Sequence, residues 1–97
     1  MRDWLRHKFG PYHRFIIGAY LFGSMLDPTR SPRDIDLVLV TVGNAGEPEW
    51  QQVRSVRDVI APLFEAEFGL PLSAMVLTLA EWREIDGVIV GERESLW

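Results

Sequence analysis

The feature that most constrains this chain is a pair of acidic residues, Asp34 and Asp36, at the start of an apolar run. Residues 35–42 are apolar almost throughout and partly β-branched, which is typical of a central strand covered on both faces. Side chains two residues apart on a strand share one face, so the two carboxylates repel each other unless a cation lies between them. Mg²⁺ prefers hard oxygen ligands and shares its shell with phosphates. The sequence therefore predicts a Mg²⁺ site at Asp34 and Asp36.

A glycine–serine pair, Gly23-Ser24, precedes this run and ends another apolar segment, residues 14–22, which we expect to be a strand. Glycine lets the backbone approach a phosphate closely, and the amides of a following helical turn can bind phosphate oxygens together with the Ser hydroxyl. Phosphoryl and nucleotidyl transfer need little beyond metal charge, phosphate positioning and an aligned nucleophile. The two motifs together favour phosphate chemistry.

The rest of the chain alternates predicted helices and strands. Pro48 suits a first helical position, apolar side chains recur at helical spacing as far as Phe68, and Gly69 is a good C-cap. Pro62 predicts a kink or a restart inside this helix. The other expected elements are a helix at residues 3–9, a strand at 72–79, a helix at 80–85 and a final short strand or extended tail at 88–90. This order predicts one α/β (α+β) domain, residues 1–97, with a small mixed sheet flanked by helices.

Composition narrows the class of protein. The 97 residues are 47% apolar and 25% charged, which is typical of a globular domain, and the absence of cysteine excludes disulfides and Cys-based zinc sites. No apolar run approaches the roughly 20 residues that span a bilayer, and the N-terminus lacks the apolar core of a signal peptide. We therefore expect a cytoplasmic location and no membrane partner. The net charge of −4 and the scattered basic residues argue mildly against nucleic acid as a partner.

The residues Leu-Phe-Gly-Ser at 21–24 and Asp-Ile-Asp-Leu-Val-Leu-Val at 34–40 resemble the signature of the polymerase-β-like nucleotidyltransferase superfamily. The pattern is most similar to that of the minimal nucleotidyltransferases, and the resemblance continues through the long helix as far as residue 73. It implies a nucleotidyltransferase fold, with Gly23 and Ser24 binding the triphosphate and Asp34 and Asp36 binding the metal ions. It also implies Mg²⁺ as cofactor and a nucleoside triphosphate, ATP in the first place, as substrate.

The sequence departs from that pattern at two positions. The resemblance places a third metal-binding carboxylate after the Gly-Leu-Pro-Leu segment, where Ser73 stands, and a hydroxyl is a poor Mg²⁺ ligand. The two-metal site is thus expected to be incomplete. The pattern also has an Arg three residues beyond the Ser, where this chain has Asp27. We assign the missing positive charge at the nucleotide to Arg33, with Arg30 as the alternative.

The prominent side chains also have plain structural interpretations. Glu81 and Asp86 are rival third carboxylates, but both lie beyond the third strand, and residues 81–84 have the pattern of a solvated helix face. The Trp side chains at 4, 50 and 82 are expected at the core or its edge, and the terminal Trp97 is expected to be disordered.

Two functions from different classes remain open. The first is a Mg²⁺-dependent enzyme that transfers a nucleoside monophosphate from NTP to an acceptor, which the intact Gly-Ser and Asp-x-Asp motifs favour. For this enzyme the resemblance implies an antitoxin role beside a HEPN-type toxin, and a homodimer is the alternative partnership. The second is a catalytically degenerate binding module that acts through protein–protein contact, which Ser73 favours. A P-loop NTPase is disfavoured because no G-x-x-x-x-G-K-[ST] motif occurs.

Overall fold

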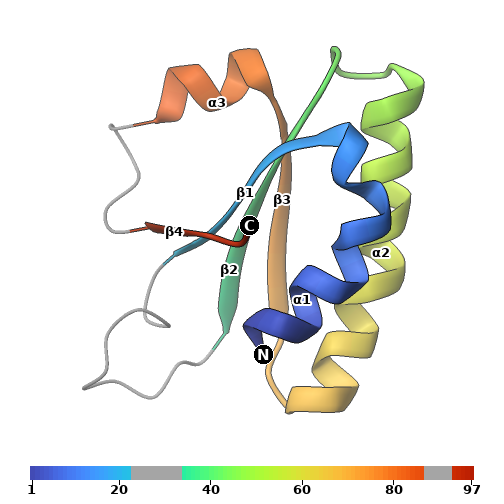
Figure 1. The fold of residues 1–97 in the computed structure, drawn as a ribbon, viewed down its shortest axis with the longest axis vertical. Coiled ribbons are helices and arrows are strands. Elements are labelled where there is room, and N and C mark those ends of the chain that lie inside the picture. Colours follow the sequence, from blue (N-terminus) through green and yellow to red (C-terminus); the bar gives the residue numbers. More distant parts are fainter. Residues whose placement is uncertain (23–33, 87–92) are drawn as a thin grey trace.

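The computed structural model describes residues 1–22, 34–86 and 93–97 of the chain. The described helices and strands, in chain order, are α1 (Arg2–Phe9), the 3₁₀ helix η1 (Gly10–Phe15), β1 (Ile16–Phe22), β2 (Ile35–Thr41), α2 (Pro48–Phe68), β3 (Leu72–Thr78), α3 (Leu79–Ile85) and β4 (Arg93–Ser95). Figure 1 shows α1 and α2 on one side of the strands and α3 on the other. The α+β class with a small mixed sheet, predicted from the sequence, is confirmed. No helix of the described residues is both long and apolar enough to cross a membrane.

The sheet has four strands in the order β3-β2-β1-β4. β1 pairs with β2 and with β4 in antiparallel fashion, whereas β2 and β3 are parallel. A parallel pair needs a long crossover connection, and α2 provides it between β2 and β3. β2 thus occupies the interior of the sheet, as its apolar sequence predicts.

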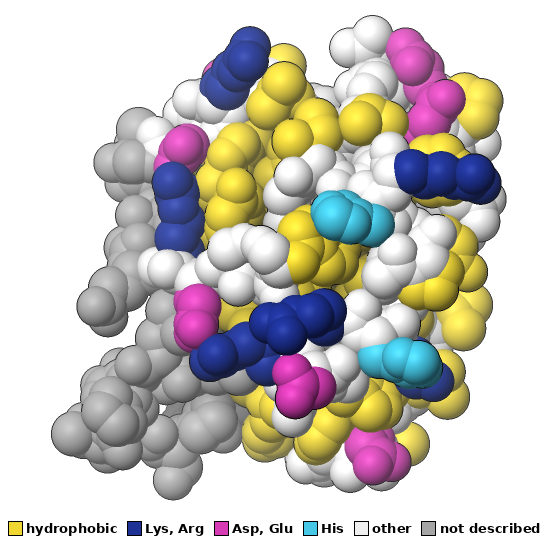
Figure 2. Space-filling view, viewed as in Figure 1, with side chains coloured by type: hydrophobic (Ala, Val, Ile, Leu, Met, Phe, Trp, Pro, Cys, Tyr) yellow, Lys and Arg dark blue, Asp and Glu magenta, His cyan; other side chains and the backbone are white. Residues whose placement is uncertain are grey.

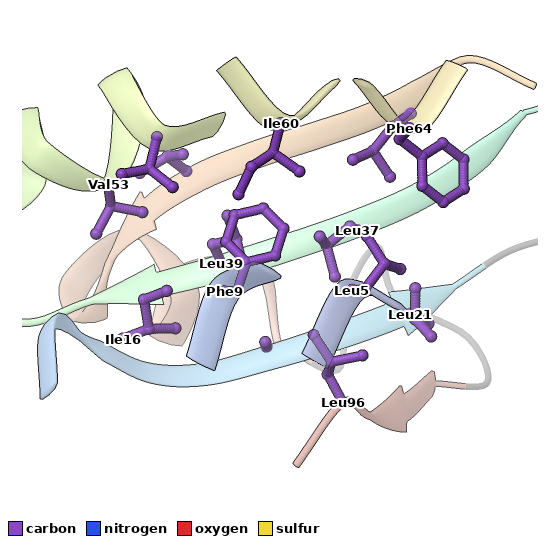
Figure 3. Packing of buried hydrophobic residues seen from close by; sticks show 14 of the residues in the cluster. Leu5, Phe9, Ile16, Leu21, Leu37, Leu39, Val53, Ile60, Phe64 and Leu96 are labelled. Carbon is purple, nitrogen blue, oxygen red and sulfur yellow. The ribbon is translucent and has the colours of Figure 1, made fainter. Parts of the chain in front are cut away.

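Most of the core lies between the sheet and the helices α1 and α2. Leu37 and Leu39 of β2 point into this layer and are buried, together with Leu5 of α1 and Phe64 of α2. Figure 3 shows these side chains converging from three elements. The neighbouring side chains Val38 and Val40 point to the opposite side of β2, where they form a second, smaller cluster with Trp82 of α3. β2 is therefore covered on both faces over most of its length, which confirms the prediction for this strand.

The long helix α2 begins and ends where its sequence predicts. Pro48 is at its N-terminus, and Gly69 caps its C-terminus with φ of +70°, a left-handed conformation that favours glycine. The predicted restart at Pro62 is wrong, because α2 continues through this residue as one helix. The packing of Val56, Ile60 and Phe64 against the sheet explains this continuity, since tertiary burial outweighs the loss of one backbone hydrogen bond.

The C-terminal segment differs from its prediction. The expected strand at residues 88–90 lies outside the described residues, and a short strand, β4, is found at Arg93–Ser95. It is followed by Leu96, which is completely buried and donates its backbone N–H to the carbonyl of Ala19 at 2.7 Å. The expected disorder of Trp97 is also wrong, because its ring packs against His13 with 4.5 Å between centroids. The C-terminus is thus fixed to β1 and η1.

The remaining boundaries differ from their predictions by a few residues. β1 begins at Ile16 and not at residue 14, because η1 extends through Phe15 after the end of α1. α3 begins directly after Thr78, whose hydroxyl accepts a hydrogen bond from the N–H of Glu81 at 3.2 Å. The Glu81 carboxylate in turn accepts from the N–H of Thr78 at 2.9 Å, which completes a capping box.

Candidate functional site

Asp34 and Asp36 lie together at the start of β2. Asp36 is the second residue of the strand and Asp34 occupies a bend immediately before it, and both side chains are half-buried. The pKa of Asp36 is raised above its ordinary value, first by burial, then by the negative charge of Asp34 and by a hydrogen bond with the Asp34 carboxyl group. The structure therefore brings the two predicted metal ligands into direct contact, and their mutual repulsion is what a cation would relieve.

Ser73 lies beside Asp36 on the neighbouring strand. The two residues are register partners in the parallel pairing of β2 and β3, so their side chains share one face of the sheet about 4.8 Å apart along the hydrogen-bonding direction. Leu72 and Ala74, on either side of Ser73, point into the main core, whereas Ser73 is exposed. The position at which the sequence lacks a third carboxylate is thus adjacent to the acidic pair. We call the side of the sheet that carries Asp36 and Ser73 the site face.

The other strands place aromatic side chains on the site face. Phe22 is the register partner of Asp36 on β1. Tyr20 is two residues earlier on the same strand, so its side chain lies on the same face. Tyr20 stacks on Trp82 of α3, with ring centroids 4.9 Å apart and planes 6° from parallel. Trp82 is only 7% exposed, which confirms its expected place in the core, whereas Glu81, Arg83 and Glu84 are exposed as expected of a solvated helix face. The acidic pair therefore borders an apolar surface that α3 partly covers.

The two rival carboxylates are engaged in other interactions. Glu81 belongs to the capping box at the start of α3. Asp86 forms an ion pair with Arg93 of β4, whose guanidinium also packs over Tyr20 and Trp82 at 5.3 Å and 5.0 Å from the ring centroids. Arg93 is a cation on the site face that the sequence analysis missed, because no strand was expected at its position.

The predicted phosphate-binding residues are not among the described residues. Gly23, Ser24 and Arg33 all lie within 23–33, as do Asp27 and Arg30. Their assignment to the nucleotide remains a prediction from the sequence. What the structure does show is that β1 ends at Phe22 and β2 begins at Ile35, and that Phe22 is the register partner of Asp36.

Two hollows on the described surface lie away from the acidic pair. One of about 430 Å³ is lined by residues of η1 and of the first turns of α2, and one of about 380 Å³ is lined by α1, η1 and the middle of α2. Neither contains a predicted site residue. Among residues 1–22, 34–86 and 93–97, no group of three or more His, Cys, Asp or Glu side chains is placed to hold a metal ion. Figure 2 shows acidic and basic side chains interspersed on the face in view.

Comparison of the structure with solved structures identifies the fold. The chain is similar to a putative nucleotidyltransferase from Sulfolobus solfataricus, with a TM-score of 0.58 and 16% sequence identity over 99% of this chain and 75% of that one. It is also similar to a mutant of the toxin–antitoxin MntA–HpeT, with a TM-score of 0.62 and 13% identity over 100% of this chain and 73% of that one. No family model matches the sequence, and a comparison with curated proteins finds no match. The chain has the minimal nucleotidyltransferase fold, as its sequence motifs predict.

We predict that Asp36→Asn stabilises the protein at neutral pH when divalent cations are absent. Burial and the charge of Asp34 raise the pKa of Asp36, so the ionised form is less favourable in the folded protein than in the unfolded chain. The stability that Asp36 contributes is present below its unfolded-state pKa and is lost as the pH rises through its folded-state pKa. Thermal unfolding in EDTA should show a higher Tm for the variant at pH 7, and this difference should shrink in acid.

Asp58→Asn is the matched control. Asp58 is exposed and forms a surface ion pair with Arg57, a kind of interaction that contributes little to stability. A similar gain in Tm for both variants, or no gain for Asp36→Asn, would contradict the unfavourable ionisation that burial and the charge of Asp34 impose on Asp36.

Proposed function

We propose that the protein is a Mg²⁺-dependent nucleotidyltransferase that transfers a nucleoside monophosphate from a nucleoside triphosphate, with ATP as the first candidate, to an acceptor. The observation that carries this proposal is the contact between Asp34 and Asp36 at the start of β2, where burial first and the charge of Asp34 second raise the pKa of Asp36. A stable fold has no need of two acids in contact, because their repulsion costs free energy. The nucleotidyltransferase fold adds independent support.

The residues of the site have distinct roles in this proposal. Asp34 and Asp36 would hold Mg²⁺, which when bound neutralises phosphate charge and aligns the reacting oxygens. Phe22 and Tyr20 form an apolar floor beside the carboxylates and reduce the access of water to them. Gly23, Ser24 and Arg33 would bind the triphosphate. Ser73 would contribute a neutral hydroxyl group, which can hydrogen-bond to a water molecule.

We further propose that the acceptor or regulator is a protein partner of the HEPN-type toxin class, so that the chain acts as an antitoxin in the cytoplasm. Two observations support this partner. One of the similar solved structures is a toxin–antitoxin, MntA–HpeT. In addition, the site face of the sheet is covered in part by α3. The described residues include no second domain that could enclose a nucleotide from the opposite side.

Ser73 favours a second candidate function, in which the chain is a catalytically degenerate module that binds its partner without transferring a nucleotide. The serine lies where the resemblance places a third carboxylate, one strand from Asp36. Replacement of a charged ligand by a neutral hydroxyl weakens a divalent-metal site. The two candidates differ in whether nucleotide binding depends on Mg²⁺.

We predict that the protein binds ATP or another NTP in a Mg²⁺-dependent manner, and that the combined substitution Asp34→Asn and Asp36→Asn abolishes this dependence. Without the two carboxylates, the protein would lack the oxygen ligands proposed to hold the metal. Calorimetry in Mg²⁺ and in EDTA checks the binding, and labelled NTPs incubated with and without cell extract check the transfer. Asp3→Asn, a change at an exposed acid on α1, is the control and should behave like the wild type. Equal nucleotide affinity in Mg²⁺ and in EDTA would contradict the proposed enzyme.

We predict that Ser73→Asp raises the affinity for Mg²⁺ by about tenfold or more, because it adds a negative charge one strand away from Asp36. Ser73→Asn has a similar size without the charge and serves as the matched control. Metal titration followed by calorimetry compares both variants with the wild type. Two outcomes would show that Ser73 does not occupy the position of a metal ligand: unchanged Mg²⁺ affinity in both variants, or an equal increase in both.

We predict that the tagged protein, purified from its native host, is recovered with a second chain in stoichiometric amount. The expected partner is helical, and mass spectrometry of the eluate should also detect a nucleotide added to that partner if the chain is an active enzyme. Recovery of the protein alone, with no nucleotide-modified protein, would count against the toxin–antitoxin proposal and would leave Mg²⁺-dependent transfer to be judged from the labelled-NTP experiment.

A further inference from the structure

The strand β3 has one paired side and one outer side. It lies at the end of the sheet and pairs with β2 along its whole length. No other strand in the described part of the chain pairs with its outer side. An unpaired strand edge presents backbone N–H and C=O groups whose preferred partner is another strand. The outer edge of β3 is therefore a candidate surface for strand addition.

Hydrogen bonds show which residues of β3 face outward. The carbonyl of Pro71 accepts from the N–H of Ile35 at 3.0 Å, and the carbonyl of Leu77 accepts from the Thr41 hydroxyl at 3.2 Å, so the odd-numbered residues face β2. The carbonyl of Ala74 instead accepts from Arg57 of α2 at 3.4 Å. Because the backbone groups of successive residues alternate in direction, Val76 faces outward like Ala74.

The composition of β3 lacks the usual protections of an edge. Its seven residues, Leu-Ser-Ala-Met-Val-Leu-Thr, include no charged residue and no proline. Met75 lies at the middle of the strand on the site face and is 53% exposed. The bond from Arg57 to the Ala74 carbonyl is long, and a carbonyl oxygen has a second lone pair for another donor. The Arg57 guanidinium is thus a charged group at this edge, and an incoming strand would share the Ala74 carbonyl with it.

We propose that the outer edge of β3 is the interface for a second copy of this chain, joined by antiparallel pairing centred on Met75. In this register Ala74 of one copy exchanges both backbone hydrogen bonds with Val76 of the other. The outward N–H and C=O groups of each strand then bond to those of its copy. The two Met75 side chains lie opposite each other and cover their exposed apolar surface. An uncharged strand meets its own copy without like-charge repulsion, and the two-fold symmetry closes the assembly as a dimer.

The dimer has a consequence for the site face. Ser73 and Met75 are on the same face as Asp36. A two-fold axis through an antiparallel pair of edge strands runs perpendicular to the sheet, so both copies present their site faces on the same side. The joined sheet then carries two acidic pairs, one on each side of the paired β3 strands. This inference stands independently of nucleotide transfer, since it uses only the backbone and side chains of β3.

Sedimentation of the purified full-length chain tests the proposal. We expect a dimer for the wild type, and we expect Met75→Lys to weaken the dimer by at least about tenfold, because it places two like charges opposite each other. Met75→Leu is the matched control and should remain dimeric. Val59→Lys changes a 63% exposed apolar residue on α2 and should also leave the dimer intact.

Amide hydrogen exchange of the wild type gives a second measurement that needs no variant. In the dimer the outward amides of Ala74 and Val76 should be protected, and dilution should accelerate their exchange while the inward amides of Met75 and Leu77 stay protected by β2. A wild type that is monomeric at its highest soluble concentration would overturn the proposal. A dimer that is weakened by Val59→Lys and unaffected by Met75→Lys would do so as well, because it would place the interface on the helices.

Discussion

The pairing of β2 with strands on both sides is the constraint on which the rest of the structure depends. β2 is the strand whose sequence is apolar on both faces, and it is buried between the helical layer and α3. Its register also fixes the chemistry, because it places Asp36 between Phe22 of β1 and Ser73 of β3. A slip of one residue would turn Leu37 and Leu39 out of the main core and Asp36 into it. Core packing thus determines the position of the candidate site with the same contacts that stabilise the fold.

The contact between Asp34 and Asp36 lowers the stability that this packing provides, because it places two carboxylates side by side. The pKa of Asp36 is raised by burial first and by Asp34 second, so part of the cost arises from the apolar surroundings that Phe22, Tyr20 and Trp82 help to provide. The same surroundings strengthen the attraction between the carboxylates and a cation, since a lower local dielectric increases every charge interaction. Under the proposed function, the same apolar surroundings would therefore destabilise the pair without a cation and strengthen the binding of a cation.

The sequence predicted the parts of the structure that depend on local pattern and burial. The apolar run after Asp34, the limits of α2 at Pro48 and Gly69, and the mixed sheet all follow from periodicity, capping and turn residues. The predicted restart at Pro62 is wrong because tertiary packing outweighed a local helix-breaking tendency, whereas a kink at this residue stays a prediction. The prediction failed at β4 because three residues with the sequence Arg-Glu-Ser carry no strand pattern of their own.

For the candidate site, sequence reasoning was limited to residues within a motif. The contact of Asp34 with Asp36 follows from their spacing, whereas the alignment of Ser73 with Asp36 depends on the parallel register between β2 and β3. Arg93 reaches the site face only through the long-range pairing of β4 with β1. No local signal reports such a contact, because the two strands are far apart in the sequence. The assignment of Gly23, Ser24 and Arg33 still depends on the motif alone.

Ser73 links the electrostatics of the site to the question of activity. A carboxylate at this position would be a third negative charge one strand from Asp36, and it would add to the repulsion that already raises the pKa of Asp36. The serine avoids this cost, so the protein without a metal ion is more stable than a complete three-carboxylate site would allow. The same substitution lowers the attraction for a second metal ion, which depends on the local density of negative charge. A serine at this position is therefore compatible with the proposed enzyme, which must stay folded between encounters with a nucleotide, and equally with the proposed degenerate module, which needs no metal. The contact between Asp34 and Asp36 supports the proposed metal-dependent enzyme, because a chain that does not bind a metal would gain stability from the loss of one of the two acids.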